Sequence, residues 1–252
     1  MARNIKLVLA YDGTAYHGWQ MQPDRPTIQS SLQRALWRVL GGPKQPPEAS
    51  GRTDAGVHAL GQVVTFRTDK PIPAPNLVSA LNDVLSSDIR VLSAEEVSSD
   101  FHPRDCARAK TYRYRLLRTD ICPPFLARFV NHYPYALDEQ AMIAAAPLIE
   151  GEHDFSSFAA VDPEKGLEDD ERSKIRTIYS SRWHREGDEL VYEVRGSGFL
   201  HHMVRNLVGT FLLLGKGTIN SKDLKRILDL KDRSAAGPTA GPEGLYLVSV
   251  EY

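Results

Sequence analysis

Residues 50–58 hold the side chains best suited to chemistry. They read SGRTDAGVH, so two glycines bracket Arg52 and Asp54, which are two positions apart. Glycines adopt positive φ angles and let a backbone approach a ligand closely. An ionised carboxylate can act as nucleophile or base towards a sugar carbon, and a neighbouring guanidinium holds it ionised or binds a phosphate beside it. The same residues also suit a structural turn in which Thr53 and Asp54 accept backbone hydrogen bonds.

Arg205 is a second candidate because of its surroundings. Residues 203–214 read as a helix dominated by valine, leucine and phenylalanine, where a guanidinium is costly unless an anion pairs with it. His201, Arg205 and Gly209 share one stripe at i, i+4 spacing, and the glycine permits close approach of another segment. We hypothesise that Arg205 reaches the catalytic pocket and pairs with Asp54. The alternative is an amphipathic helix on which Arg205 is solvated.

The bulk composition is that of an ordinary globular protein. The chain has 252 residues, 42% hydrophobic and 25% charged, which is enough for one large domain or two intimate halves. No apolar run approaches the roughly 20 residues that cross a bilayer, and the start MARNIKLVLAYDG reads as a first strand and not as a signal peptide. Cys106 and Cys122 lack metal or redox spacing, so we expect a cytoplasmic protein without a membrane partner.

Hydrophobic periodicity predicts the elements that must position these residues. Strands are expected at residues 5–11, 62–66, 89–97, 111–118, 175–183, 190–196 and 245–252, and helices at 28–39, 76–85, 139–149, 199–214 and 222–230. Charged residues 162–172 are expected to form a surface loop. The order predicts an α+β fold of two similar halves, with a mixed, mainly antiparallel central sheet and helices packed on one face. Residues 1–105 would carry the Asp54 loop, and residues 106–252 would complete the active-site cleft.

Several strings along the chain resemble the motifs of one enzyme family. GRTDAGVHALGQ closely resembles the catalytic loop of the tRNA pseudouridine synthase A (TruA) family. YDGT and GWQ at 11–20 resemble its opening motif, FHPR and KTYRY at 101–114 its central motif, and GFL and MVR at 198–205 its late helix. The motifs follow the family's order over nearly the whole chain, and no matched catalytic position departs from the pattern.

The resemblance implies a concrete reaction. Family members bind the anticodon stem-loop of tRNA, flip out a uridine at position 38, 39 or 40, cleave its N-glycosidic bond, rotate the base and rejoin it through C5. They need neither cofactor nor metal, and they are homodimers in which one tRNA contacts both subunits. We therefore expect an isomerase that recognises RNA more by shape than by base edges.

The resemblance also assigns roles to residues. Asp54 takes the place of the catalytic carboxylate, whether it attacks the ribose C1′, attacks the base C6 or removes a C2′ proton. Tyr112 matches the tyrosine that stacks on the target base and helps to remove the C5 proton; stacking contributes about 1–3 kcal/mol. Without the resemblance, Tyr112 reads as a strand residue packed into the core.

Residues expected to bind the substrate are mostly basic. Although the net charge of the chain is −1, residues 101–118 contain six lysines or arginines and one aspartate, and phosphate binding needs only a local basic surface. Because alternate residues of a strand face opposite ways, some of these cations are expected to be solvated. Beside Tyr112, the expected substrate-binding set is Arg52, Arg104, Lys110, Arg113, His58 and His202. His58 is expected to support the loop, and the histidine spacing predicts no metal site.

Two other readings remain open at this stage. A non-catalytic RNA-binding module would keep the basic strand and Tyr112 but would have no need of Asp54 beside Arg52. A carboxylate-dependent glycosidase normally uses two acids that flank the bond, and no second acid stands out here.

Overall fold

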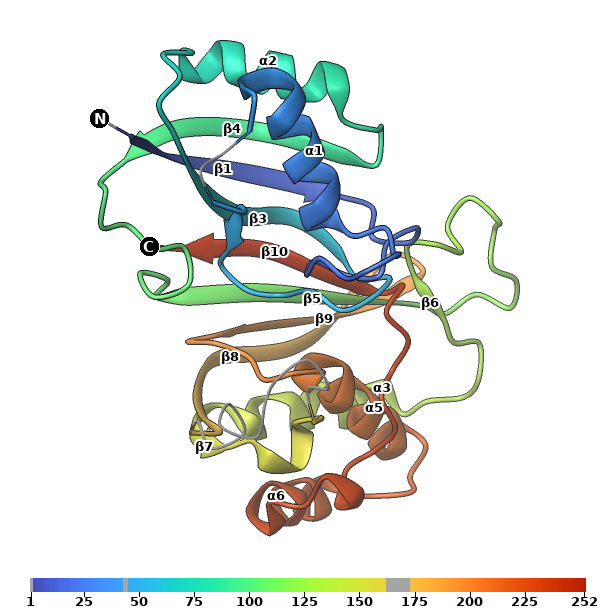
Figure 1. Ribbon diagram of the computed structural model, residues 1–252. Helices are drawn as coiled ribbons and strands as arrows, with labels where there is room; N and C mark the ends of the chain where they lie inside the picture. Colours follow the sequence, from blue (N-terminus) through green and yellow to red (C-terminus); the bar gives the residue numbers. More distant parts are fainter. Residues whose placement is uncertain (1, 43–44, 162–172) are drawn as a thin grey trace. The chain divides into compact units, whose positions relative to one another are not determined.

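The computed structural model describes residues 2–42, 45–161 and 173–252 (Figure 1). The chain forms two compact units. Unit 1 comprises Met1–Arg108 and Tyr246–Tyr252, and unit 2 comprises Ala109–Leu245. The last strand of the chain groups with the first unit in this division. Each unit combines a sheet with helices, so the predicted α+β class is confirmed.

The sheet of unit 1 carries the Asp54 loop between two of its strands. Its strands are β1 (Arg3–Tyr11), β2 (Glu48–Ala49), β3 (His58–Thr68), β4 (Ile89–Val97) and β10 (Leu245–Glu251), in the order β4-β1-β3-β10 with β2 paired to β3. β1 runs antiparallel to β3 and β4, whereas β10 runs parallel to β3 through the pairs Tyr246–His58 and Leu247–Ala59. The sheet is therefore mixed and mainly antiparallel, as predicted.

Two helices of unit 1, α1 (Ile28–Leu40) and α2 (Ala74–Val84), lie on one face of this sheet (Figure 1). α1 begins where Thr27 accepts a hydrogen bond from the Ser30 amide, and it ends at Gly41, whose φ of 73° is left-handed. Its inner face buries Ile28, Leu32, Ala35, Leu36 and Leu40. Each such large side chain contributes about 1.5–3 kcal/mol by leaving water.

Unit 2 is built around an antiparallel sheet. Its strands are β5 (Ala109–Leu117), β7 (Gly151–Asp154), β8 (Ile175–Glu186) and β9 (Glu189–Gly196), in the order β5-β9-β8-β7, and β6 (Asn131–His132) pairs parallel with β5. Its helices are α3 (Glu139–Ala145), α5 (Met203–Gly215) and α6 (Ser221–Leu230). Phe211 of α5 packs against the rings of Trp183 and Tyr192 on the sheet.

Two helices of unit 2 differ from their predicted bounds. α3 ends at Ala145 and continues as a 3-10 turn, Ala146–Ile149, because Pro147 has no amide hydrogen and cannot continue an α-helix. α5 begins at Met203 and not at residue 199, because His202 before it adopts a left-handed φ of 59°. The loop expected at residues 162–172 lies outside the described residues. Within the described ranges, no helix has the length and apolar character needed to span a bilayer.

Candidate active site

The loop that carries Asp54 joins β2 to β3, and a glutamine fixes its first residues. The amide of Ser50 donates to the carbonyl of Val63 over 2.8 Å. The Ser50 hydroxyl donates to Gln62 Oε1 over 2.8 Å, and Gln62 Nε2 donates to the Gly51 carbonyl over 2.9 Å. Gln62 is fully buried on β3. The start of the loop is therefore held by the sheet.

Thr53 anchors the middle of the loop to β1. Its side chain is buried, and its Oγ1 lies 2.9 Å from the hydroxyl of Tyr11, the last residue of β1. Complete burial of Tyr11 raises the pKa of its phenol to about 12, so the phenol is neutral at physiological pH and can donate a hydrogen bond. The residue directly before Asp54 is thus fixed through both its side chain and its carbonyl, which accepts from the Trp19 amide over 3.0 Å.

The segment from Gly13 to Gly18 packs directly against the backbone of the same loop. A Cβ atom on Gly13 would lie 2.0 Å from the Val57 carbonyl oxygen, and one on Gly18 would lie 2.5 Å from the Thr53 carbonyl oxygen. Gly18 also adopts a φ of +81°, which L side chains rarely adopt. Glycine is therefore required at both positions for the opening motif to approach the Asp54 loop.

The end of the loop forms a turn around Asp54. The Val57 amide donates to the Asp54 carbonyl over 3.1 Å, and the amide of Gly56, whose φ is 77°, donates to the Tyr16 carbonyl over 3.2 Å. Asp54 is half-buried in this turn, whereas Arg52 is exposed. The loop thus presents a carboxylate and a cation from a backbone that is fixed on both sides.

His58 closes the loop at the start of β3. Its Nδ1 lies 3.1 Å from the Gly13 amide and 3.3 Å from Asp12 Oδ1, and its ring stacks on Tyr246 at a centroid distance of 4.8 Å. Only 1% of the residue is exposed. Since a buried ring cannot contact RNA directly in this conformation, we assign His58 the support of the loop.

In unit 2, Tyr112 and Tyr114 lie on the same face of β5 but in different surroundings. Tyr112 is 8% exposed and contacts Phe199 edge to face, with ring centroids 4.9 Å apart. Tyr114 is fully buried, and its hydroxyl donates to the Gly241 carbonyl over 2.8 Å. Burial raises the pKa of Tyr114. Tyr114 is therefore a core residue.

Arg205 is held against a neighbouring segment of its own unit. Its Nε donates to the Ala240 carbonyl over 2.7 Å, and the Ala240 amide donates to the Arg205 carbonyl over 3.1 Å. One turn further along α5, a Cβ on Gly209 would lie 1.7 Å from the Pro238 carbonyl oxygen. The close approach predicted at Gly209 is therefore confirmed. Arg205 is half-buried and oriented, and it is not an extended, fully solvated side chain.

His201 and His202 precede α5 and do not lie within it. Their ring centroids are 3.9 Å apart, and His201 Nδ1 lies 3.2 Å from the Val161 carbonyl. Both side chains are half-buried. The left-handed backbone of His202 produces this closeness, which a continuous helix would not allow.

The basic segment is partly neutralised by the neighbouring strand. Arg113 lies 3.3 Å from a carboxylate oxygen of Glu193, and Arg115 lies 2.6 Å from one of Glu189. Lys110 is half-buried, whereas Arg104 is exposed in a turn of unit 1. Sequence reasoning missed the two glutamates because the pairing of β5 with β9 joins residues that are 74 and 80 positions apart in the sequence.

The candidate residues divide between the two units. Asp54, Arg52, His58 and Arg104 belong to unit 1, whereas Tyr112, Lys110, Arg113, His202 and Arg205 belong to unit 2. Sequence reasoning missed Gln62, Tyr11 and Ala240, which position the others through hydrogen bonds. The pair of glycines around Ala240, at 237 and 241, was the one local signal of close packing there.

Comparison with known proteins gives consistent matches over almost the entire chain. A family model described as tRNA pseudouridine synthase matches residues 7–104 and 145–252. The chain is 50% identical to a protein of Solibacter usitatus, covering 99% of this chain and 100% of the relative. It is 45% identical to one of Citrifermentans bemidjiense, with 99% and 98% covered, and 43% identical to one of Lacticaseibacillus casei, with 99% of each covered. All three relatives are named tRNA pseudouridine synthase A.

Proposed function

The chain belongs to the family of tRNA pseudouridine synthases, and from this premise we propose that it isomerises uridine to pseudouridine in the anticodon stem-loop of tRNA. The reaction breaks the bond from C1′ to N1 and forms one from C1′ to C5, while C5 loses a proton and N1 gains one. It is redox-neutral, and the enzyme is an isomerase that transfers a group within one molecule. We propose positions 38, 39 and 40 as its targets, following the family.

The single observation that carries the proposal is the way the Asp54 loop is fixed. Strand β3 holds its start through Gln62, β1 holds Thr53 through Tyr11, and residues 16–19 hold both Thr53 and Gly56 through backbone hydrogen bonds. A structural turn on the surface needs no such convergence. Fixing a carboxylate before the substrate arrives lowers the entropic cost of reaching the transition state. Asp54 therefore acts as the catalytic carboxylate, as nucleophile or as base.

Two residues of unit 2 complete the catalytic set in this proposal. Arg205 supplies a cation whose plane is oriented by its hydrogen bond to Ala240, and it stabilises negative charge during the reaction. Tyr112 offers an aromatic ring that Phe199 holds from the edge. The ring stacks on the flipped uracil and assists removal of the C5 proton.

Cations and one histidine bind the rest of the RNA in this proposal. Arg52 and Arg104 are exposed on unit 1 and suit phosphate oxygens directly. Lys110, Arg113 and His202 contribute from unit 2, where the ion pair to Glu193 also orients Arg113.

We also propose that the enzyme works as a homodimer in the cytoplasm. Unit 2 exposes Ile121 to 80% and Phe125 to 88% in the segment before β6, and large exposed apolar side chains mark interaction surfaces. Cys106 and Cys122 are free thiols, which suits a reducing compartment.

Release of tritium from tRNA that contains 5-tritiated uridine tests the proposal. Wild-type protein should release tritium, and Asp54→Asn should lower the rate at least about 10²-fold, because the catalytic carboxylate is lost while its shape is kept. Asp83→Asn removes an exposed carboxylate on α2 and should leave the rate unchanged. Both variants should still bind tRNA.

The outcomes separate the competing functions. Tritium release by Asp54→Asn at the wild-type rate would reject Asp54 as the catalytic carboxylate. Binding of tRNA without release by the wild type would favour an RNA-binding module, and free uracil as product would favour a glycosidase.

A further inference from the structure

Helix α1 exposes a surface that the catalytic proposal does not use. It consists of Arg34, Trp37 and Arg38 with the flanking residues Met21, Ser30 and Gln33, and we call it the α1 surface. Resting on the proposed function, we propose that the α1 surface is a second RNA-binding site, at which the two arginines bind phosphates and Trp37 stacks on an unpaired base of the tRNA substrate.

Trp37 is the exposed tryptophan of the chain. It is 59% exposed, whereas Trp19 and Trp183 are 2% and 3% exposed. Nearby Met21 is 44% exposed. One side of the indole packs near Gly42, on which a Cβ atom would lie only 2.7 Å from the ring. The exposed part of the ring is open to stacking on a base, which is worth about 1–3 kcal/mol.

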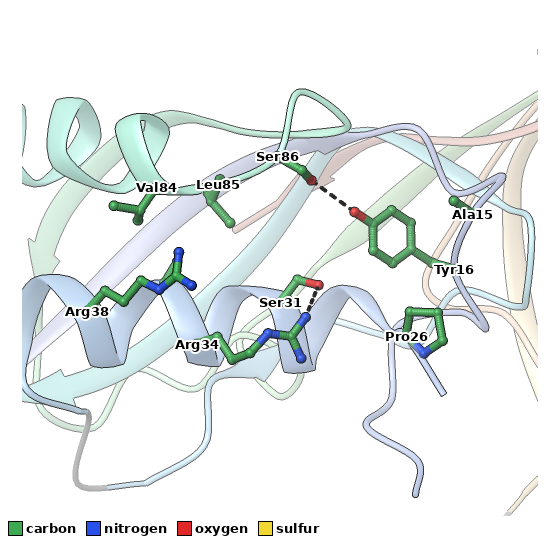
Figure 2. A pocket seen from close by; sticks show the side chains of 10 residues that line it. Ala15, Tyr16, Pro26, Ser31, Arg34, Arg38, Val84, Leu85 and Ser86 are labelled. Atoms are coloured by element: carbon green, nitrogen blue, oxygen red, sulfur yellow. Dashed lines mark hydrogen bonds between the residues drawn. The ribbon is translucent and has the colours of Figure 1, made fainter. Parts of the chain in front are cut away.

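Two hollows adjoin the arginines. One of about 430 Å³ is lined by Arg34, Arg38 and the remaining residues of the α1 surface. The other, of about 300 Å³, lies between α1 and the end of α2 and is also lined by Arg34 and Arg38, together with Tyr16 and Ser86 (Figure 2). The two guanidinium groups therefore stand on a ridge between two hollows. Successive nucleotides could place their phosphate on this ridge and their bases to either side.

The polar groups at these hollows suit a nucleotide. Arg34 Nη2 donates to the Ser31 hydroxyl over 3.0 Å, and the hydroxyls of Tyr16 and Ser86 lie 3.0 Å apart. Gln33 Oε1 is buried and has no hydrogen-bond partner among the described residues. A buried acceptor without a donor is costly. Because Gln33 lines the larger hollow, a rotation of its side chain on binding would bring Oε1 to an amino group of a base or to a ribose hydroxyl.

The charge of the α1 surface favours a polyanion over a second copy of this chain. Within the part of the chain that the structure describes, neither Arg34 nor Arg38 forms an ion pair, and α1 contains no acidic residue. A carboxylate oxygen of Asp88 lies 3.4 Å from the Tyr16 hydroxyl, so we expect phosphate at the arginine end of the smaller hollow. A two-fold interface centred on this surface would bring the arginines of two copies together, which is repulsive.

The α1 surface is connected to the catalytic loop through Tyr16. The Tyr16 side chain lines the smaller hollow, and its carbonyl accepts the hydrogen bond from Gly56, two residues after Asp54. Both features belong to unit 1. In this proposal one RNA molecule contacts the α1 surface while its target uridine is at Asp54, so we expect binding there to affect the affinity for tRNA and not the chemical step.

The test compares two double variants that remove the same charge. Arg34→Gln with Arg38→Gln should raise KM and Kd for tRNA about tenfold, lower the slope of log Kd against log salt by about 1–2, and leave kcat at saturating tRNA unchanged. Lys222→Gln with Lys225→Gln on the exposed face of α6 is the matched control and should change Kd less than about twofold. Trp37→Ala should raise Kd about fivefold or more.

Tryptophan fluorescence gives an independent readout that does not depend on a variant's folding. Because Trp19 and Trp183 are buried, acrylamide quenching of the wild type reports mainly on Trp37. Bound tRNA should protect Trp37 from the quencher, and Trp37→Phe should abolish the tRNA-dependent part of the quenching.

Other outcomes would overturn this proposal without touching the proposed function. If both double variants release tritium and have the same Kd and the same salt slope, the α1 surface is not an RNA site. Acrylamide quenching of Trp37 that tRNA does not change would lead to the same conclusion. A loss of dimer in sedimentation, with unchanged tRNA affinity, would assign it to a second copy instead. If the wild type itself releases no tritium, the proposed function fails, whereas protection of Trp37 by tRNA would still be measurable.

Discussion

The amide of Trp19 donates a 3.0 Å hydrogen bond to the carbonyl of Thr53, directly before Asp54. This bond joins two segments more than thirty positions apart, as residue numbers 19 and 53 show. This hydrogen bond explains how the opening motif, at residues 11–20, supports Asp54, which lies outside that motif. Residues 13–19 form a backbone support for the Asp54 loop, and the next prediction tests that support.

Gly18→Ala should damage both folding and catalysis. The new Cβ would lie 2.5 Å from the Thr53 carbonyl oxygen, and the φ of +81° would be strained. Gly41→Ala is the matched control, because Gly41 has a similar φ of +73° with nothing within 4 Å. Both should lose about 1–2 kcal/mol through strain, but only Gly18→Ala should also lower kcat, by about 10²-fold. Equal kcat values in the two variants would contradict the role of the contact.

Thr53→Val should reveal the link between the loop and β1. Valine keeps the shape but removes Oγ1, so the buried Tyr11 hydroxyl keeps only the 3.4 Å contact from Gln62. We expect a loss of about 1–3 kcal/mol in the free energy of unfolding, measured in urea. Tyr11→Phe should lose less, and the double variant should show a coupling of about 0.5–1.5 kcal/mol. Strictly additive losses would mean that the two hydroxyls do not interact.

Arg205→Lys should lower tritium release at saturating tRNA at least about tenfold. A lysine keeps the charge but lacks the planar group that Ala240 orients through Nε. Arg226→Lys is the matched control, because it makes the same exchange on the exposed face of α6. Arg226 forms a surface ion pair with Asp223 there, and its replacement should leave the rate unchanged. Full activity of Arg205→Lys would remove Arg205 from the catalytic set.

Glu139→Gln should weaken unit 2 in a pH-dependent way. Burial of Glu139 raises its pKa, but hydrogen bonds from Arg118 and Arg185 outweigh burial, so the pKa lies below its ordinary value. Because the pKa is lower in the folded state, the ionised Glu139 contributes its full stabilisation at pH values above the pKa of the unfolded chain, about 4.3. This contribution is lost as the pH falls through the pKa of the folded state. At pH 7 the variant should lose about 1–3 kcal/mol.

Urea unfolding from pH 7 down to pH 3 checks this expectation. The gap between wild type and Glu139→Gln should narrow as the pH falls below about 4. Glu152→Gln, at an exposed position on β7, should unfold like the wild type. A gap that stays constant over this range would rule out the two arginines as the cause.

Local signals in the sequence predicted much of the fold. The helix predicted at residues 28–39 corresponds to α1, whose ends are set by the local capping residues Thr27 and Gly41. The apolar run of β1 and the turn at Gly187 between β8 and β9 are equally local. Such features depend on neighbours within a few residues, so one sequence suffices to find them.

The parts that the sequence did not reveal depend on distant residues. The start of α5 is set by the left-handed backbone at His202. The sequence indicated close packing at Gly209 but did not indicate that its neighbour is Pro238. Arg113 forms an ion pair with Glu193 on the neighbouring strand. A count of cations along the sequence therefore overstates the positive charge at this position. Asp54 was recognised by its motif, whereas its supporting groups Gln62 and Tyr11 required the fold.

Strand β10 gives unit 1 a particular order of assembly during translation. The stacking partner of His58 is Tyr246, and all of unit 2 is encoded between them. A ribosome therefore synthesises the Asp54 loop early, but the ring beneath His58 and the parallel neighbour of β3 become available only after residue 246 has emerged. Because domains tend to fold as units while they are made, a nascent chain lacks the packing beneath the Asp54 loop until unit 2 has been synthesised. Interrupted synthesis should thus yield fragments in which this loop is not fully supported.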